Sequence, residues 1–206
     1  MDPTQQTYNK SAQKFSDFFA TFGSRQHEID FARRSTQKQV PLTVLELGCG
    51  DGRDAKDIFS FTQDYTGLDY SKGLINIAKQ NYPEHSELFA VGDMKTFEMN
   101  PEQYDLIFAF ASFLHLSKEE LGPILQKYSL SLRSGGVLCM SFKAADSYER
   151  RVQVDTFGER IFYFYNSTEI LNMMPQDMSL LHQSNYKKGS TNWFTLTFRN
   201  GGTHAK

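Results

Sequence analysis

Apolar residues recur every three or four positions near the start of the chain, and this spacing predicts an amphipathic helix over residues 4–22. Gly23 is expected to end that helix, since glycine is common just past helix C-termini. A second helix is expected over residues 25–37, with Ile29, Phe31 and Ala32 facing inward. Residues 1–40 are therefore predicted to form a helical cap in front of the rest of the chain.

From residue 42 the pattern changes to short apolar runs separated by helical segments. The expected strands cover residues 42–47, 65–68, 88–91, 104–110 and 137–142, with a turn at 134–136 before the last of them. The expected helices cover residues 54–61, then a segment that Ser71 caps and that ends before Pro83, then a segment that begins with a capping box at 117–120. Strands that are apolar throughout and alternate with helices favour a parallel sheet covered on both faces.

The pattern changes again after residue 143. Residues 144–165 hold a charged stretch and alternating aromatic positions, and we expect them to form a lid inserted beside the sheet. Ser167 is expected to cap a short helix that reaches about Met174. Alternation over 180–186 and 193–199, around a turn at 187–190, predicts a closing antiparallel hairpin.

Composition narrows the class of protein. With 206 residues, one domain over 1–206 is expected, and a net charge of −2 gives no overall field that attracts nucleic acid. Two cysteines show no disulfide or metal-ligand spacing. The N-terminus has no signal-peptide pattern and no apolar run approaches a membrane span, so a cytoplasmic location with no membrane partner is expected. The oligomeric state is left open.

The most informative segment runs from the strand at 42–47 through three alternate glycines, Gly48, Gly50 and Gly52. Glycine has no Cβ, so a ligand can lie against the bare backbone of such a turn. The helix that follows adds free N–H groups and the positive end of its dipole. The segment predicts a site for a nucleotide-type cofactor. The dinucleotide fingerprint G-x-G-x-x-G needs glycine where this chain has Arg53, which counts against a nicotinamide enzyme.

Four further motifs follow in order. Asp69 ends the second strand, where a carboxylate is placed to accept both hydroxyls of a ribose. Gly92-Asp93-Met94 follows the third strand, residues 104–116 form the fourth strand and its loop, and residues 132–138 lead into the fifth. With the glycine loop, this set resembles the class I S-adenosylmethionine-dependent methyltransferases, and Tyr8 to Phe15 resembles a helix common in small members.

The resemblance implies a fold, a cofactor and a reaction. The fold would be a Rossmann-like α/β class I methyltransferase fold, with a seven-stranded, mostly parallel sheet, helices on both faces and a C-terminal antiparallel hairpin. The cofactor would be S-adenosyl-L-methionine, and the reaction metal-independent transfer of its methyl group to a small molecule. The implied cofactor-binding residues are Glu46, Gly48, Cys49, Gly50, Gly52, Arg53, Asp69, Tyr70, Ser71, Asp93, Met94, Ala109 and Ser112.

The resemblance also suggests roles within that set. Asp93 would approach the adenine amine and Met94 would offer an apolar wall to the ring. Arg53 is either a partner for the cofactor's carboxylate or a surface residue of the first helical turn. Ala109 to Ser112 would lie beside the methionine part of the cofactor.

The acceptor side is less defined. His115 lies in the loop after the fourth strand, and its ordinary pKa suits a general base, although a purely structural role is the alternative. Tyr8, His115, Tyr163 and Tyr165 are the candidate acceptor-site residues, and aromatic core packing is the alternative for the two later tyrosines. No residue is expected to bind a metal.

Three other functions remain open. The first is a non-catalytic protein of the methyltransferase fold that binds S-adenosylmethionine or a partner without turnover. An RNA methyltransferase would need a basic face assembled from Arg33, Arg34, Lys187 and Lys188. A nicotinamide-dependent oxidoreductase is the third alternative, which Arg53 disfavours.

Overall fold

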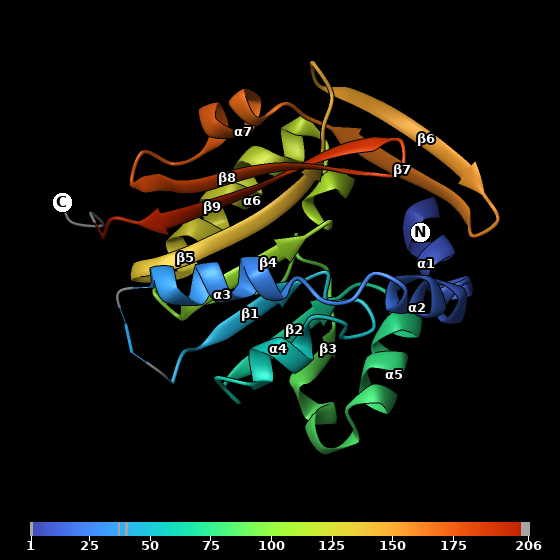
Figure 1. Ribbon diagram of the computed structural model, residues 1–206, viewed down its shortest axis with the longest axis horizontal. Coiled ribbons are helices and arrows are strands. Elements are labelled where there is room, and N and C mark those ends of the chain that lie inside the picture. The colour runs from blue at the N-terminus through green and yellow to red at the C-terminus, as the bar shows by residue number, and fades with distance from the viewer. Residues whose placement is uncertain (1, 37, 40, 203–206) are drawn as a thin grey trace.

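The computed structural model describes residues 2–36, 38–39 and 41–202, and its centre is a seven-stranded sheet in the order β3-β2-β1-β4-β5-β9-β8 (Figure 1). The strands are β1 (Val44–Leu47), β2 (Tyr65–Asp69), β3 (Phe89–Val91), β4 (Tyr104–Phe110), β5 (Leu132–Lys143), β8 (Met178–Lys188) and β9 (Thr191–Asn200). The pairings from β3 to β5 are parallel, and β9 pairs antiparallel with both β5 and β8. The predicted sheet and C-terminal hairpin are confirmed.

Helices cover both faces of this sheet. One face packs against α3 (Gln26–Ser35), α4 (Ala55–Phe59) and α5 (Lys72–Asn81), and the other against α6 (Lys118–Ser131) and α7 (Ser167–Met173). Two short 3-10 helices lie in connections: η1 (Pro83–Leu88) between α5 and β3, and η2 (Phe113–His115) between β4 and α6. The apolar core therefore lies in two layers, one on each side of the strands.

Successive residues of the central strands place their side chains alternately in the two layers of the core. On β4, Leu106 and Phe108 pack toward α3 and α4, whereas Ile107 packs toward α6. Side chains alternate across a strand, so a strand buried on both faces must be apolar at every position. This arrangement explains why residues 104–110 contain almost no polar side chain and why β4 is buried along its whole length.

The N-terminal segment forms two helices where the sequence pattern predicted one. They are α1 (Pro3–Lys10) and α2 (Ala12–Ala20). The helical conformation is interrupted at Ser11, whose φ of −107° and ψ of 20° are not helical. The Ser11 hydroxyl donates to the carbonyl of Phe157 at 2.6 Å, and the Thr7 hydroxyl donates to the carbonyl of Glu159 at 2.6 Å. These tertiary bonds fix the break, and hydrophobic spacing alone does not encode them.

Residues 144–165 contain a separate two-stranded hairpin, β6 (Glu149–Asp155) and β7 (Gly158–Phe164). Figure 1 shows this hairpin beside the main sheet, with its turn next to α1. The predicted alternation is therefore present, and the role of the segment as a lid stays a prediction.

Two local predictions were wrong. The glycines at 135 and 136 do not form a turn, because β5 already begins at Leu132 and the ladder to β4 shifts register there. Gly135 takes a φ of +76°, so the pair makes an irregular strand segment. Asn166, not Ser167, caps α7, since its side chain accepts from the Glu169 nitrogen at 2.9 Å.

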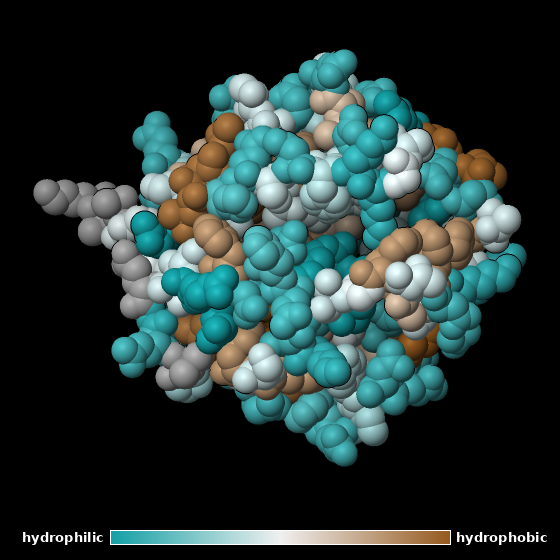
Figure 2. Space-filling model, in the orientation of Figure 1, coloured by the Kyte–Doolittle hydropathy of each residue, from teal (hydrophilic) through white to brown (hydrophobic). Residues whose placement is uncertain are grey.

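The surface in Figure 2 shows small, scattered hydrophobic areas among polar side chains, including one over β6. Val152 and Val154, which are 47% and 73% exposed, contribute to the area over β6. Within residues 2–36, 38–39 and 41–202, no helix combines the length and the hydrophobicity that crossing a bilayer requires.

Candidate active site

A cavity of about 690 Å³ opens at the carboxyl ends of the parallel strands. Its walls come from α1, α2, the glycine loop after β1, the ends of β2 and β4, and the loop after β3. The end of β5, the β6–β7 hairpin and the β8–β9 turn complete it. This edge is where open α/β sheets bind ligands, and the volume lies in the range of small-molecule sites.

The three glycines of the loop have different tasks. All have positive φ, at +70° for Gly48, +59° for Gly50 and +78° for Gly52. A Cβ on Gly48 would lie 2.4 Å from the Cβ of Ser112, so this glycine lets the β4 loop approach. A Cβ on Gly50 would meet nothing within 4 Å, and Gly50 lines the cavity. The bare backbone at Gly50 is therefore the part of the loop left open to a ligand.

Asp69, at the end of β2, holds the glycine loop in place. Its Oδ2 accepts from the Gly50 nitrogen at 2.9 Å and its Oδ1 accepts from the Ser71 nitrogen at 2.8 Å. Burial raises the pKa of Asp69 to about 6, against the two backbone hydrogen bonds, which lower it. The carboxylate faces the cavity and retains lone pairs that can accept further donors.

Glu46, on β1, is a second buried acid in the cavity wall. It is 2% exposed, and its Oε2 accepts from the Tyr65 hydroxyl at 2.6 Å. Burial, reinforced by the neighbouring charge of Asp54, raises the pKa of Glu46 to about 8. A cationic ligand group close to this side chain would lower that pKa again.

The loop after β3 forms one end of the cavity. Asp93 accepts from the Lys95 nitrogen at 2.8 Å, and the Met94 carbonyl accepts from the Tyr128 hydroxyl at 2.7 Å. Tyr128 is fully buried, so it pins the loop to α6. On the same side, the Gln5 side chain donates to the Tyr70 carbonyl at 2.9 Å. Tyr70, Asp93 and Met94 thus share one end of the cavity.

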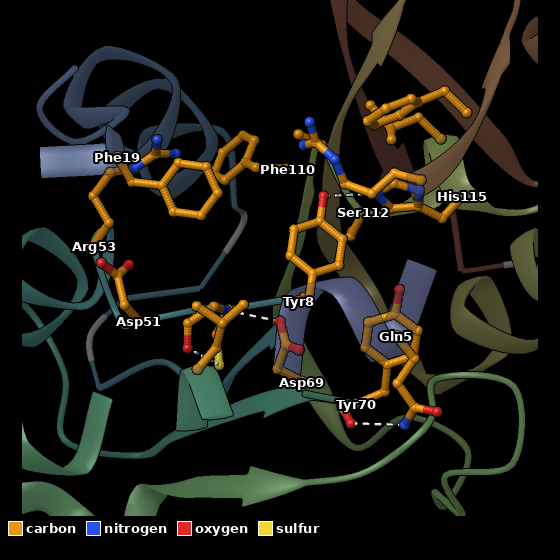
Figure 3. Close-up of a pocket in the computed structure, with 18 of the residues that line it drawn as sticks. Gln5, Tyr8, Phe19, Asp51, Arg53, Asp69, Tyr70, Phe110, Ser112 and His115 are labelled. Carbon is orange, nitrogen blue, oxygen red and sulfur yellow. Dashed lines mark hydrogen bonds between the residues drawn. The ribbon is translucent and has the colours of Figure 1, made fainter. Parts of the chain in front are cut away.

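Two guanidinium groups lie at the opposite end. Arg25 and Arg53 both pair with Oδ2 of Asp54, at 2.7 Å and 3.2 Å. Arg53 also lies over the ring of Phe19, 5.7 Å from its centroid. Figure 3 shows Arg53, Phe19 and Asp51 on one side of the cavity and Tyr70 with Gln5 on the other.

Tyr8 and His115 meet in the wall formed by α1 and η2. The Tyr8 hydroxyl lies 3.1 Å from Nε2 of His115, and Nδ1 lies 2.7 Å from the carbonyl of Ile161 (Figure 3). A carbonyl only accepts, so Nδ1 carries the proton and Nε2 is the acceptor of the tyrosine hydroxyl. Burial, with smaller effects of Lys143 and Arg160, lowers the pKa of His115 to about 3. Such a histidine is neutral at physiological pH and a weak base.

The structure brings most of the predicted residues to this cavity. Its lining includes Tyr8, Glu46, Gly48, Cys49, Gly50, Arg53, Asp69, Tyr70, Asp93, Met94, Ser112 and His115. Gly52, Ser71, Ala109, Tyr163 and Tyr165 are outside the lining.

Each of those five has another task. Gly52 makes room for the rings of Tyr82 and Phe89, and Ser71 caps α5. Ala109 packs in the core on the α6 side. Strand alternation explains Tyr163, because Arg160 and Phe162 line the cavity and the odd-numbered positions of β7 do not, and the Tyr163 ring stacks on that of Tyr148 with 6.0 Å between centroids. Tyr165 is fully buried and donates to the Leu116 carbonyl at 2.8 Å.

Sequence reasoning missed several lining residues. They are Gln5, Phe19, Arg25, Asp51, Lys143, Arg160 and Phe162. For Lys143 a signal existed, since it ends the apolar fifth strand at the ligand-binding edge of the sheet. Arg160 lies in the hairpin inserted between β5 and α7, and no local pattern places it here.

Several polar atoms in the wall lack a partner within the described residues. The hydroxyls of Tyr70 and Ser112 and Nε of Arg53 are buried without a hydrogen bond. Buried polar groups are rarely left unsatisfied, so a ligand with polar groups along its length fits this wall. An adenosine joined to an amino acid has such groups, and it matches the open backbone at Gly50 and the acceptor atoms of Asp69.

The fold is of the Rossmann-like class I methyltransferase type, with a cavity of small-molecule size at the carboxyl edge of its sheet. Residues 44–136 match the methyltransferase domain family. The malonyl-[acyl-carrier protein] O-methyltransferase of Acetivibrio thermocellus is 31% identical over 144 residues, which are 64% of this chain and 50% of that protein. The chain thus spans half the length of this relative.

Solved structures agree on the fold. The 1,6-didemethyltoxoflavin-N1-methyltransferase of Burkholderia thailandensis matches with a TM-score of 0.73 at 14% identity, over 95% of this chain and 86% of that one. The [4+2]-cyclase SpnF matches with a TM-score of 0.65 at 16% identity, over 86% and 82%. The chain therefore has the fold of the class I S-adenosylmethionine-dependent methyltransferases, and its residues 44–136 match the methyltransferase domain family.

Proposed function

We propose that this protein transfers the methyl group of S-adenosylmethionine to a small-molecule acceptor without a metal ion. The observation that supports this most directly is the open backbone at Gly50, whose nitrogen donates to the Asp69 carboxylate at 2.9 Å. The match of residues 44–136 to the methyltransferase domain family and the cavity at the carboxyl edge of the sheet support the same function.

Charge and hydrogen bonding suggest how the cofactor lies. Asp69 would accept the ribose hydroxyls, and Asp93 with Met94 would contact the adenine. Glu46 would face the ammonium group of the methionine part. Arg25 and Arg53, already gathered on Asp54, are the two cations available to its carboxylate.

The cofactor supplies an activated methyl group on a positively charged sulfur. The protein's own part is then to align the acceptor, exclude water and handle any proton that the acceptor releases. Tyr8 and His115 orient the acceptor wall, because each fixes the other and the Ile161 carbonyl fixes the imidazole. With a pKa near 3, His115 serves as a hydrogen-bond acceptor and not as an efficient proton acceptor.

The proposed independence from metal ions rests on the chemistry of the cofactor's sulfonium group. A sulfonium methyl needs no Lewis acid, so we expect transfer to persist in a metal chelator. The relative from Acetivibrio thermocellus is named for methylation of a malonyl group on a carrier protein. We propose a small molecule, or a small group presented in the same way, as the acceptor here.

A second candidate function is binding without methyl transfer. The [4+2]-cyclase SpnF shares the fold, which shows that this architecture supports other chemistry. The two functions separate in one assay: single-turnover release of S-adenosylhomocysteine requires methyl transfer.

Ligand-induced stabilisation tests the proposal. At about a hundred times its Kd, a ligand that binds only the folded protein stabilises it by roughly 2.7 kcal/mol. We expect thermal unfolding to shift upward with S-adenosylmethionine or S-adenosylhomocysteine and to be unaffected by NAD. A shift with NAD and none with either sulfur cofactor would exclude the proposed function.

A further inference from the structure

Two cationic side chains from different strands line the cavity near His115. Lys143 ends β5 and Arg160 lies on β7, and both line the cavity beside His115. The Phe162 ring contacts both, with Nζ of Lys143 3.2 Å and the guanidinium carbon of Arg160 5.2 Å from its centroid. The two charges therefore share one aromatic platform.

The negative charge in this region does not balance them. Asp155 pairs with Arg160, and it also accepts from the Gln153 side chain and the Phe157 nitrogen. Within the described residues, no carboxylate oxygen lies within 4 Å of Nζ of Lys143, which faces the rings of Phe162, Phe164 and Trp193.

Both cations show the effects of this shortage of negative charge. Nε of Arg160 is buried without a hydrogen-bond partner among the described residues. Burial, together with the charges of Arg160 and Arg151, lowers the pKa of Lys143 to about 8, and Asp155 opposes this only in part. A cation without a charged partner, such as Lys143, and an unsatisfied buried donor, such as Nε of Arg160, are both costly, so an incoming anion is the favourable complement.

We propose that the acceptor carries an anionic oxygen group, a carboxylate or a comparable delocalised oxyanion, and that Lys143 and Arg160 bind this group over the ring of Phe162. This inference rests on the proposed function, because it names the substrate class of the same cavity. The anion anchors the acceptor beside Tyr8 and His115, and the aromatic rings cover its apolar part. A neutral isostere lacks the charge that the two cations require.

The only tryptophan of the chain, Trp193, provides a direct reporter. It lines the cavity, and Nζ of Lys143 lies 5.9 Å from its ring. The probes are acetate, benzoate and phenylacetate, each paired with its neutral amide. Each is titrated at pH 7 into the protein alone and into the protein saturated with S-adenosylhomocysteine, while tryptophan fluorescence is followed.

The expected result is saturable binding of at least one carboxylate, with the matching amide at least roughly tenfold weaker. Lys143→Met should weaken carboxylate binding by a similar factor, because a charged hydrogen bond is lost, and Lys143→Arg should restore most of it. Methionine suits the aromatic surroundings, so the variant is expected to fold. Lys118→Met is the matched control, since Lys118 lies over Tyr148 outside the cavity and should have no effect.

Three results would overturn the inference: equal affinity for acid and amide, no effect of Lys143→Met, or no binding of any carboxylate up to about 50 mM, a concentration at which binding energy is below roughly 2 kcal/mol. Calorimetry with S-adenosylhomocysteine separates the two claims. If that cofactor fails to bind while carboxylates are still selected, the anion site stands and the proposed function fails. If the cofactor binds and carboxylates are not selected, the reverse holds.

Discussion

The hydroxyl of Tyr8 lies 3.1 Å from Nε2 of His115, and this contact joins the N-terminal helix α1 to the loop after β4. Neighbouring bonds join the same helix to the rest of the site. Gln5 donates to the Tyr70 carbonyl, and the Thr4 hydroxyl accepts from the Ile161 nitrogen. One helix therefore contacts the loop after β2, the loop after β4 and the β6–β7 hairpin together.

The first prediction concerns the acid stability of the fold through His115. Its pKa is about 3 in the folded protein and near the ordinary 6.5 in the unfolded chain. The unfolded state therefore binds the extra proton between those values, so this contribution to stability is present above pH 6.5 and is lost as pH falls toward 3. The maximum slope is about 1.4 kcal/mol per pH unit.

The test compares the wild type with His115→Asn, whose side-chain amide can still donate to the Ile161 carbonyl. Urea unfolding between pH 4 and 7 should show a shallower loss of stability in the variant. Tyr8→Phe, which keeps the titratable imidazole, is the control and should retain the wild-type slope. Identical slopes for His115→Asn and wild type would contradict the proposed burial of a neutral imidazole.

The second prediction concerns the pH dependence of cofactor binding through Asp69. In the free protein its pKa is about 6, and the ionised form is the one that accepts hydroxyl hydrogen bonds. The contribution of Asp69 to the affinity for S-adenosylhomocysteine should therefore level off about one unit above pH 6 and fall by up to roughly tenfold per unit below pH 6. Asp69→Asn should bind weakly with no such slope.

Asp69 also has a structural task, so stability must be measured alongside binding. Its two backbone hydrogen bonds to Gly50 and Ser71 would be only partly replaced by an amide. Loss of a partner for one buried N–H costs about 1–3 kcal/mol. A variant that unfolds at the same denaturant concentration and binds as tightly as wild type would remove Asp69 from the site.

The third prediction concerns proton release through Glu46. Its pKa of about 8 leaves it mostly protonated at pH 7 in the free protein. If it faces the cofactor's ammonium group, binding lowers that pKa and up to one proton is released. Calorimetric titrations in buffers with different ionisation enthalpies should differ accordingly, and a buffer-independent enthalpy at pH 7 would exclude this role.

Neutralising Glu46 should raise the stability of the free protein but lower its affinity for the cofactor. Because the pKa of Glu46 is raised on folding, its contribution is fully present below the unfolded value near 4.3 and is lost as pH rises through 8. Glu46→Gln resembles the protonated acid, so it should stabilise the free protein at pH 8 by on the order of 1–3 kcal/mol. It should weaken cofactor binding at the same pH.

The sequence predicted those parts of the molecule that local patterns encode. The apolar strands, the glycine loop and the acid at the end of β2 depend on residues close together in the chain, and the structure has them in the expected places. The break at Ser11 and the meeting of Tyr8 with His115 depend on contacts between segments more than 100 residues apart. The choice of Tyr163 over Phe162 failed because residues of the two parities point to opposite faces of β7, and only the fold shows which face meets the cavity.

The most direct test of the central claim is a calorimetric titration with S-adenosylhomocysteine of the wild type, Gly50→Ala and Gly23→Ala. Both glycines have similar positive φ, +59° and +67°, and a Cβ on either meets nothing within 4 Å. Each alanine should therefore cost a similar 1–2 kcal/mol or so of stability from backbone strain. Of the two glycines, only Gly50 lines the cavity. We predict saturable binding by wild type and Gly23→Ala and a loss of at least roughly tenfold in Gly50→Ala. Equal affinity in all three proteins, or no binding by the wild type, would contradict a cofactor-binding site at the glycine loop.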